Sequence, residues 1–329
     1  MKSNEKIIGI LAAILMLVIG MGQWNAAFAE RKGIDRGIMR VTFLYAIETT
    51  GGRGEKLRSP MDIYYDRKAK ELYIADAGLG AILVYDNNGM YLDKISVTSK
   101  EGVPTMIAVD NDGRIFVGHN NSPRISVMDF RGTPIEVLDL PGVIDGVASS
   151  VRPLYLAANS QDGSVYTLKS SGGMVRIDAD GLEHEEILID GGDPDDMPHS
   201  IFGFSIDRQG RFLFSDMRPY SIVRFDRSQG SFQRFGSPGI LHGQIARPAG
   251  TTSDDAGHIF ATSTVRNKVL TYDRDGNFIE EFGGIGKGYG RFYMPSKIVS
   301  DGKDRLYVLE TPLERVQVFK VEFLQEAGG

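Results

Sequence analysis

The sequence predicts an all-β fold made of six repeated units, and three observations lead to that prediction. Short segments such as Arg305–Glu310 (RLYVLE) and Lys268–Asp273 (KVLTYD) alternate apolar and polar side chains with period two, as strands do. The segments are separated by hairpin-type turns such as Asp112-Gly113 and Asn88-Gly89. The same succession of segments then recurs at a nearly constant spacing, which indicates a repeat architecture.

The repeat period identifies the architecture. The third apolar segment of each unit ends at an aligned position, and the steps between these positions are 43, 49, 48, 47 and 47 residues: Asp86, Asp129, Asp178, Asp226, Asp273 and Lys320. Four strands per unit, repeated radially, make the blade of a β-propeller. Since one blade cannot bury both of its faces, six stacked blades supply one core. We therefore predict one six-bladed domain over residues 30–329, with blades near 60–98, 104–140, 153–190, 200–235, 248–282 and 295–320.

The two ends of the chain are predicted to meet in the last blade. That unit has only three strands, Lys297–Ser300, Arg305–Leu309 and Arg315–Phe319, and little chain follows them. The segment Arg40–Glu48, ahead of the first unit, can supply the fourth strand. Closing the ring in this way leaves no unpaired blade at the seam.

Residues 1–29 have the pattern of a secretory signal peptide. Lys2 and Lys6 precede an apolar run from Ile7 to Gly22, and Ala27-Phe28-Ala29 offers a cleavage site before Glu30. The alternative is an uncleaved membrane anchor. We favour cleavage because a run of about 16 apolar residues is shorter than the roughly 20 that span a bilayer. The mature protein is then predicted to be exported to the periplasm or the extracellular space, with no stable membrane insertion.

Composition excludes several classes of function. The chain has no cysteine, so it carries no disulfide, no lipid-modified cysteine and no thiolate metal site. Its formal net charge is −6, and it becomes −7 without Lys2, Glu5 and Lys6 of the leader. Nucleic acid is not a predicted partner, because an acidic surface does not neutralise phosphates.

The repeat resembles that of a known family. Each unit runs through Phe-Gly, a Gly-rich loop, Pro, an apolar strand, an Asp-x-x-Gly turn, Tyr-Val-x-Asp, a polar loop and Arg-Val-Gln-Val-Phe, most completely in the first, fifth and sixth units. This pattern resembles the NHL repeat over residues 40–320. The resemblance implies a six-bladed NHL propeller but no single function, since such propellers include RNA binders, protein-binding modules and a few lyases.

The Gly-rich stretch Phe282–Phe292 (FGGIGKGYGRF) does not match a phosphate-binding loop. Glu281 stands where the first glycine of a P-loop is required, and Gly288 stands where its serine or threonine should be. The stretch precedes Pro295 as Gly51–Gly54 precedes Pro60. We therefore predict that it is a crossover from one blade to the next, on the face that carries all inter-blade loops.

One aligned position in every unit is polar. The end of the second strand is occupied in turn by Asp76, His119, Lys169, Asp216, Ser263 and Glu310. These residues could form a ligand-binding ring at the channel mouth, or each could accept hydrogen bonds from the loop that follows it. The same inter-blade face is predicted to carry several arginines: Arg53, Arg58, Arg152, Arg218, Arg247 and Arg291.

The sequence offers two candidate metal sites, and neither is the favoured interpretation of its residues. His119, His199 and His242 are expected on the inter-blade face, which would suit zinc. However, they occupy non-equivalent places in the repeat, unlike the matched histidines of NHL-type peptide-amidating lyases, so separate surface histidines are favoured. The second candidate is a loop with four acids that could bind calcium: Asp190, Asp193, Asp195 and Asp196. A solvated acidic loop is the favoured interpretation there. No cofactor is predicted.

The favoured function is that of an exported, non-enzymatic binding or scaffold module that recognises a protein partner, or a small ligand, through its inter-blade loops. The residues expected on that face are Asp76, His119, Arg152, His199, Asp216, Arg218, His242, Arg247 and Glu310. The alternative is a metal-assisted lyase or hydrolase that uses His119, His199 or His242 with nearby acids.

Overall fold

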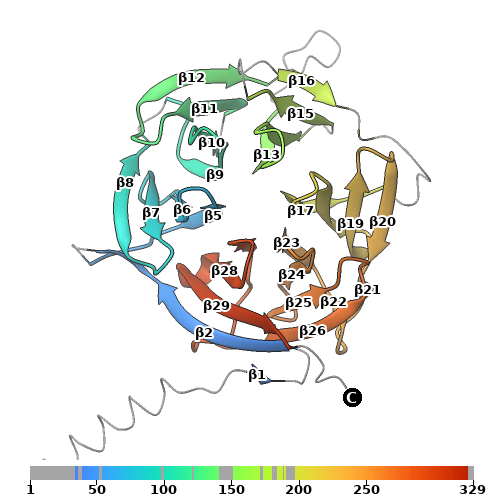
Figure 1. The fold of residues 1–329 in the computed structure, drawn as a ribbon. Helices are drawn as coiled ribbons and strands as arrows, with labels where there is room; N and C mark the ends of the chain where they lie inside the picture. Colours follow the sequence, from blue (N-terminus) through green and yellow to red (C-terminus); the bar gives the residue numbers. More distant parts are fainter. Residues whose placement is uncertain are drawn as a thin grey trace, which may run out of the picture.

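Six antiparallel sheets, five with four strands and one with five, stand around a central axis in the computed structural model (Figure 1). The structure describes residues 34–35, 39–51, 54–97, 100–120, 122–140, 151–170, 173–179, 184–187, 189 and 197–324. The predicted leader and the acidic loop with Asp190, Asp193, Asp195 and Asp196 lie outside these residues. No helix in the described part of the chain is long and apolar enough to cross a membrane.

Each of the first five blades is one continuous segment, with its strands paired in chain order from the axis outwards. Their strands are β5 (Pro60–Asp66), β6 (Glu71–Asp76), β7 (Ala81–Asp86) and β8 (Tyr91–Ser96) in blade 1; β9 (Pro104–Val109), β10 (Ile115–His119), β11 (Arg124–Met128) and β12 (Pro134–Asp139) in blade 2; β13 (Pro153–Ala158), β14 (Val165–Lys169), β15 (Met174–Ile177) and β16 (His184–Ile187) in blade 3; β17 (Ile201–Ile206), β18 (Phe212–Met217), β19 (Tyr220–Asp226) and β20 (Ser231–Phe235) in blade 4; and β23 (Pro248–Ser253), β24 (Ile259–Ser263), β25 (Lys268–Tyr272) and β26 (Phe278–Gly283) in blade 5.

Blade 6 joins the two ends of the chain, as the sequence predicted. Its inner strands are β27 (Lys297–Ser300), β28 (Arg305–Glu310) and β29 (Arg315–Phe323), and β2 (Met39–Ile47) pairs antiparallel with β29. Figure 1 shows blue β2 along the outer side of red β29. The short β1 (Ile34–Asp35) pairs with the outer edge of β2. The observed closing strand thus begins and ends one residue earlier than the predicted Arg40–Glu48.

Small elements fill the connections. Two crossovers contain a two-stranded ribbon: β3 (Thr49–Thr50) pairs with β4 (Glu55–Lys56), and β21 (Ser237–Pro238) pairs with β22 (Gln244–Ile245). A short 3₁₀ turn, η3 (Thr311–Leu313), links β28 to β29. In the predicted Gly-rich crossover, Gly283 and Gly284 have φ of +96° and +118°, which side chains disfavour. A Cβ on Gly283 would also lie 2.4 Å from the Phe292 ring. The stretch is therefore a backbone turn against a buried ring.

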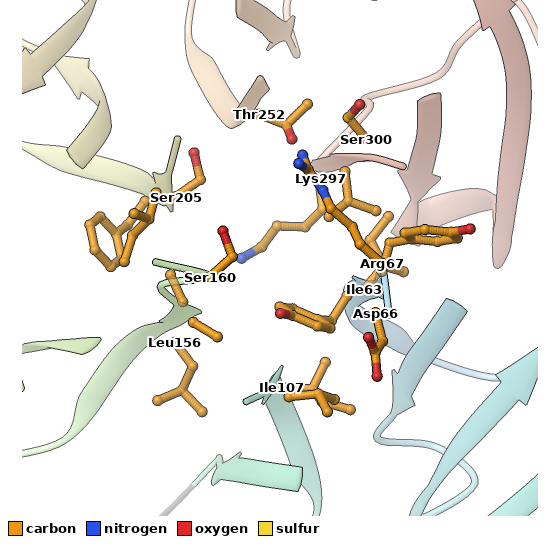
Figure 2. A pocket seen from close by; sticks show the side chains of 18 of the residues that line it. Ile63, Asp66, Arg67, Ile107, Leu156, Ser160, Ser205, Thr252, Lys297 and Ser300 are labelled. Carbon is orange, nitrogen blue, oxygen red and sulfur yellow. The ribbon is translucent and has the colours of Figure 1, made fainter. Parts of the chain in front are cut away.

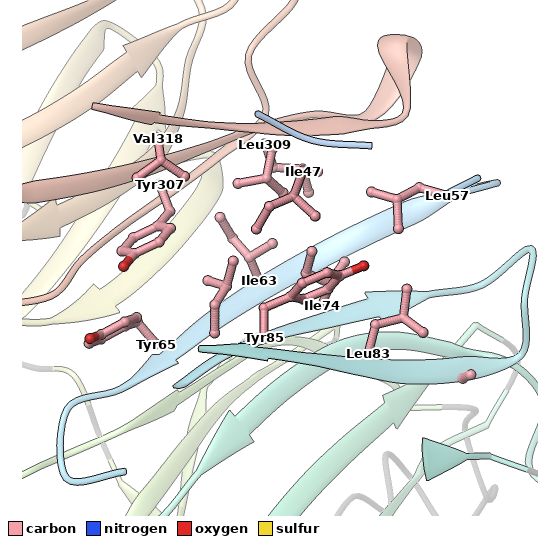
Figure 3. Packing of buried hydrophobic residues seen from close by; sticks show 13 residues of the cluster. Ile47, Leu57, Ile63, Tyr65, Ile74, Leu83, Tyr85, Tyr307, Leu309 and Val318 are labelled. Carbon is pink, nitrogen blue, oxygen red and sulfur yellow. The ribbon is translucent and has the colours of Figure 1, made fainter. Parts of the chain in front are cut away.

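The hydrophobic core lies between neighbouring blades. The structure has six buried apolar clusters, and each joins the facing sides of two adjacent blades. Figure 3 shows the cluster between blades 1 and 6, where Ile63 and Tyr65 of β5 meet Tyr307 of β28 and Ile47 of β2. Because Ile47 belongs to this core, the N-terminal strand supplies packing as well as hydrogen bonds to the closed ring.

Candidate functional site

The acidic residues at the ends of the second strands hold the inter-blade crossovers in place. Asp76 is fully buried and accepts hydrogen bonds from the backbone N–H groups of Arg58, Ser59 and Leu79 at 2.9, 3.0 and 3.0 Å. Of these donors, Arg58 and Ser59 belong to the crossover that precedes β5. The acid therefore fixes the preceding crossover as well as the loop that follows it, which is more than the sequence analysis considered.

The same arrangement recurs around the ring at a constant sequence distance. Buried Asp216 accepts from the N–H groups of His199 and Ser200 at 3.1 and 2.9 Å, and buried Glu310 accepts from Tyr293 N–H at 2.7 Å. In each case the donor lies 16 to 18 residues before the acceptor. These three carboxylates thus accept hydrogen bonds from backbone N–H groups. Asp216 also forms an ion pair with Arg234, and Glu310 forms one with Arg315.

Non-acidic residues take over this role in the other blades. In blade 5, Ser263 Oγ accepts from Ala246 N–H at 3.1 Å and donates to the Ala246 carbonyl at 2.7 Å. In blade 2, His119 is 2% exposed, and its Nδ1 lies 3.0 Å from the Gly102 carbonyl. In blade 3, Lys169 contacts Glu186 instead, while the next residue, Ser170, accepts from Arg152 N–H at 2.9 Å. Ser263 and His119 thus contact their crossovers from the aligned position, whereas in blade 3 the neighbouring Ser170 does so.

The three histidines of the inter-blade face are separately bonded. The Nε2 of His119 lies 2.8 Å from Ser126 Oγ, and burial lowers the pKa of this imidazole. His199 is about half exposed, with its Nδ1 3.9 Å from Asp216. His242 lies 3.3 Å from Glu281. Within the described residues, no three His, Asp or Glu side chains gather closely enough to hold a metal ion.

Several cationic side chains of this face are exposed, although Arg58 forms an ion pair with Glu55 at 3.7 Å and Arg53 lies outside the described residues. Arg152 and Arg218 are exposed and make no ion pair with a described residue. Arg247 has a left-handed backbone with φ of +52°, and its guanidinium lies 5.5 Å from the centre of the Phe202 ring. Lys287 and Arg291, in the crossover from blade 5 to blade 6, are also exposed without a described ion-pair partner.

Exposed apolar side chains accompany these cations, which the sequence analysis did not anticipate. They lie in the crossovers and loops of blades 4 to 6, and we call them the apolar patch: Ile240 (73% exposed), Leu241 (68%), Val265 (57%), Ile285 (72%) and Met294 (39%). Hydrogen bonds connect their loops, since Arg247 O accepts from Thr264 N–H and Asn267 binds both Gly284 N–H and Met294 N–H. The three loops that carry the patch are therefore joined to one another by hydrogen bonds.

A central channel lies behind this face, bordered by the innermost strand of each blade. Aligning these strands at the Asp or Asn that ends them gives six equivalent positions, in ring order: Asp62, Met106, Tyr155, Gly203, Gly250 and Lys297. Of these residues, Asp62, Gly203, Gly250 and Lys297 line the central cavity. Register shifts in blades 1, 3 and 4 fall immediately before Asp62, Tyr155 and Gly203. Bulges of this kind redirect the side chains next to them.

Lys297 and Asp62 meet inside the channel. Lys297 Nζ lies 3.2 Å from Asp62 Oδ1 and 5.0 Å from the centre of the Tyr155 ring, which belongs to the opposite side of the ring of blades. Burial raises the pKa of Asp62, although the Lys297 ammonium opposes this shift. Burial also raises the pKa of Tyr155 to about 12, so its hydroxyl stays protonated at neutral pH. This pair was not predicted from the sequence, where only the alignment of the six first strands places Asp62 and Lys297 at equivalent positions.

Comparisons with known proteins bear on the fold. No protein-family model matches this sequence, and no curated protein matches it significantly. Among solved structures, a protein of unknown function from Bacteroides thetaiotaomicron is similar, at 14% identity and a TM-score of 0.62 over 86% of this chain and 76% of that one. Virginiamycin B lyase from Staphylococcus aureus matches at 16% identity and a TM-score of 0.56, over 82% of each chain. A gluconolactonase from Xanthomonas campestris matches at 17% and 0.58, over 87% of this chain and 91% of its own.

The chain is a six-bladed β-propeller. At these identities the similarity establishes the fold alone, because one propeller fold supports many unrelated activities. Function has to be argued from the surfaces of this chain.

Proposed function

We propose that this protein is an exported, non-enzymatic binding propeller that holds a protein partner on its inter-blade face, and that its blades are NHL repeats. The observation that carries the proposal is the apolar patch beside exposed arginines that have no ion-pair partner among the described residues. Isolated soluble proteins rarely expose a continuous apolar surface unless it is used in binding. Aromatic, Met and Arg side chains are also the residues that interfaces enrich.

Charge indicates what kind of segment would fit. Arg218, Lys287 and Arg291 lie in loops on the same face as the patch and have no described ion-pair partner, although the whole chain carries a net charge of −6. The neighbouring Glu281 is buried and already bound by Arg266 and Lys268. A partner segment that combines acidic and apolar side chains would therefore complement this surface.

The proposal is tested by capturing partners from the native exported fraction with wild-type and variant protein. The double variant Leu241→Asp, Val265→Asp places charge on the patch without touching the core. Met90→Asp is the matched control, because Met90 is 65% exposed in a turn on the opposite face. We expect the partner to bind the wild type and the control and to be lost with the double variant.

The arginines are tested separately. Replacing Arg152, Arg218 and Arg247 with alanine should weaken capture and reduce its salt dependence, since exposed charges steer association. Retention of the partner by both the patch variant and the arginine variant would refute this placement of the site. Capture of a basic protein as the specific partner would refute the proposed charge complementarity.

A second candidate is a metal-assisted lyase or hydrolase, favoured by the fold shared with a lyase and a gluconolactonase. His242 beside Glu281 would be its first residue to test. Stoichiometric zinc or calcium in the purified native protein, together with a stability that falls on chelation, would support it. Metal-free protein whose stability is unaffected by a chelator would count against it.

A further inference from the structure

The first strand of each of the first five blades carries a bulge close to the inter-blade face. In blade 1, Pro60 pairs with Asp76 and Asp62 pairs with Ala75, so that Met61 has no partner on the second strand. A bulge of this kind redirects the side chain of its extra residue. The equivalent positions in the other blades are Thr105, Leu154, Phe202, Ala249 and, directly before β27 and without a bulge, Ser296.

Three of these residues are large, apolar and exposed: Met61 (38%), Leu154 (43%) and Phe202 (43%). All three belong to innermost strands, and each innermost strand contacts the next one around the ring. Their side chains therefore stand around the entrance of the channel on the inter-blade face. We call these three residues the channel mouth.

The channel mouth is a separate surface from the cavity inside the channel. The residues that follow the bulge positions make contacts across the channel, since Lys297 Nζ lies 3.2 Å from Asp62 Oδ1 and 5.0 Å from the centre of the Tyr155 ring. The next side chains along three of the strands line the cavity (Figure 2): Ile63, Ile107 and Leu156. None of the three residues of the mouth lines it. Their exposed apolar surface is therefore not explained by the interior of the channel.

The exposed charge at the mouth is positive. Two positions before the bulge positions, the crossovers carry in ring order Ser59, Val103, Arg152, Ser200, Arg247 and Met294. Arg152 is exposed, the guanidinium carbon of Arg247 lies 5.5 Å from the centre of the Phe202 ring, and neither arginine forms an ion pair with a described residue. No acid occurs at these positions or at the bulge positions.

The acids of the neighbouring second strands are not exposed to a ligand at the mouth. Asp76 is fully buried beneath three backbone N–H groups. Asp216 and Glu310 are also buried, and each is paired with an arginine. The mouth thus combines apolar side chains with two available cations.

We propose that the channel mouth anchors the protein partner by taking up one apolar side chain, flanked in the partner by acidic residues whose carboxylates pair with Arg152 and Arg247. A large apolar side chain surrounded on several sides is the type of contact that dominates binding energy at interfaces. Arg247 also ends the crossover that carries Ile240 and Leu241 of the apolar patch, so one partner can contact both surfaces. This inference rests on the proposed function, because it names the segment by which the partner is held.

The test is a methyl NMR titration of the full mature chain, labelled at its methionine methyl groups, with the peptide acetyl-Gly-Glu-Phe-Glu-Gly-amide. One control peptide has Ser in place of Phe, and another has Lys in place of both Glu. The Met61 signal, assigned with Met61→Leu, reports on the mouth, and the signal of Met90, on the opposite face, is the internal control. We expect the first peptide to shift the Met61 signal alone and both control peptides to bind about tenfold more weakly. An unmoved Met61 signal, or equal binding of either control peptide, would overturn the proposal.

Variants assign the binding to the mouth. The double variant Leu154→Ser, Phe202→Ser should weaken binding of the Phe peptide about tenfold. The matched control is Leu92→Ser, Phe130→Ser, which makes the same exchanges at exposed side chains on the outer parts of blades 1 and 2 and should leave binding unchanged.

The two arginines are replaced separately from the apolar side chains. Arg152→Gln, Arg247→Gln should remove the preference for the Glu-flanked over the Lys-flanked peptide. An unchanged preference would refute the role of these arginines.

Failure of this inference differs from failure of the proposed function. A partner that is lost with the Leu241→Asp, Val265→Asp variant but retained by Leu154→Ser, Phe202→Ser would refute the mouth as its anchor and leave the partner surface in place. Capture of no partner at all would refute the proposed function, and the peptide titration would still decide whether the mouth selects acidic segments with an apolar side chain.

Discussion

The buried carboxylate of Asp76 offers the sharpest test of how the ring is held together. Replacing Asp76 with alanine removes the acceptor of three backbone N–H groups, two of them in the crossover that leads into β5. The side chain is fully buried, so these N–H groups lose their partner in the folded state. We expect the variant to fold but to be clearly destabilised.

The magnitude follows from the bonds lost. A hydrogen bond to a charged acceptor contributes about 1.5–3 kcal/mol, and water can reach part of an exposed crossover after truncation. The lower end of this range for three bonds gives a loss of about 4.5 kcal/mol in the free energy of unfolding. Ser263 occupies the same position in blade 5 but makes two neutral hydrogen bonds, at about 1 kcal/mol each, so Ser263→Ala should lose about 2 kcal/mol.

Urea unfolding followed by circular dichroism measures both variants against the wild type. A smaller loss for Asp76→Ala than for Ser263→Ala would refute the reasoning. Full stability of Asp76→Ala combined with weaker partner capture would instead favour the interpretation of this position as part of a ligand-binding ring.

Three further predictions concern closure, pH and export. Deleting residues 38–48 should abolish soluble folding, because Met39, Val41 and Ile47 are buried and each contributes about 1.5–3 kcal/mol; a soluble, cooperatively unfolding deletion protein would contradict ring closure. Burial raises the pKa of Glu281, but hydrogen bonds from Arg266 and Lys268 outweigh it and lower this pKa to about 2. The ionised Glu281 carboxylate therefore contributes fully to the free energy of unfolding above pH 4.5, and this contribution is lost as the pH falls toward 2. The difference in stability between the wild type and Glu281→Gln, measured by urea unfolding, should shrink as the pH is lowered from 4.5 to 2. Trp24 is the sole tryptophan, so signal cleavage should leave exported protein without tryptophan fluorescence, whereas a retained anchor would keep it.

Much of the fold was determined by local sequence. Period-two alternation predicted the strands, and the acids at the ends of most first and third strands predicted their turns. Asp66 and Asp86, for example, accept hydrogen bonds from the N–H groups of Lys68 and Asn88. The constant repeat gave the number of blades, and the missing fourth strand of the last unit predicted the pairing of β2 with β29. These features are readable because each depends on residues within one repeat or on a simple count of strands.

The sites were decided only by the tertiary structure. In the sequence, an acid at the end of a second strand could be a ligand-binding residue on the surface. In the structure, it is buried against a crossover about 17 residues earlier in the chain, and this contact depends on how the blades stack. Asp62 and Lys297 belong to the first and last blades and meet only because the ring closes. The apolar patch likewise gathers loops of three blades. The sequence by itself therefore determined the strands, turns and repeat, whereas the ring geometry decided which side chains share a channel or a face, because those contacts join residues far apart in the chain.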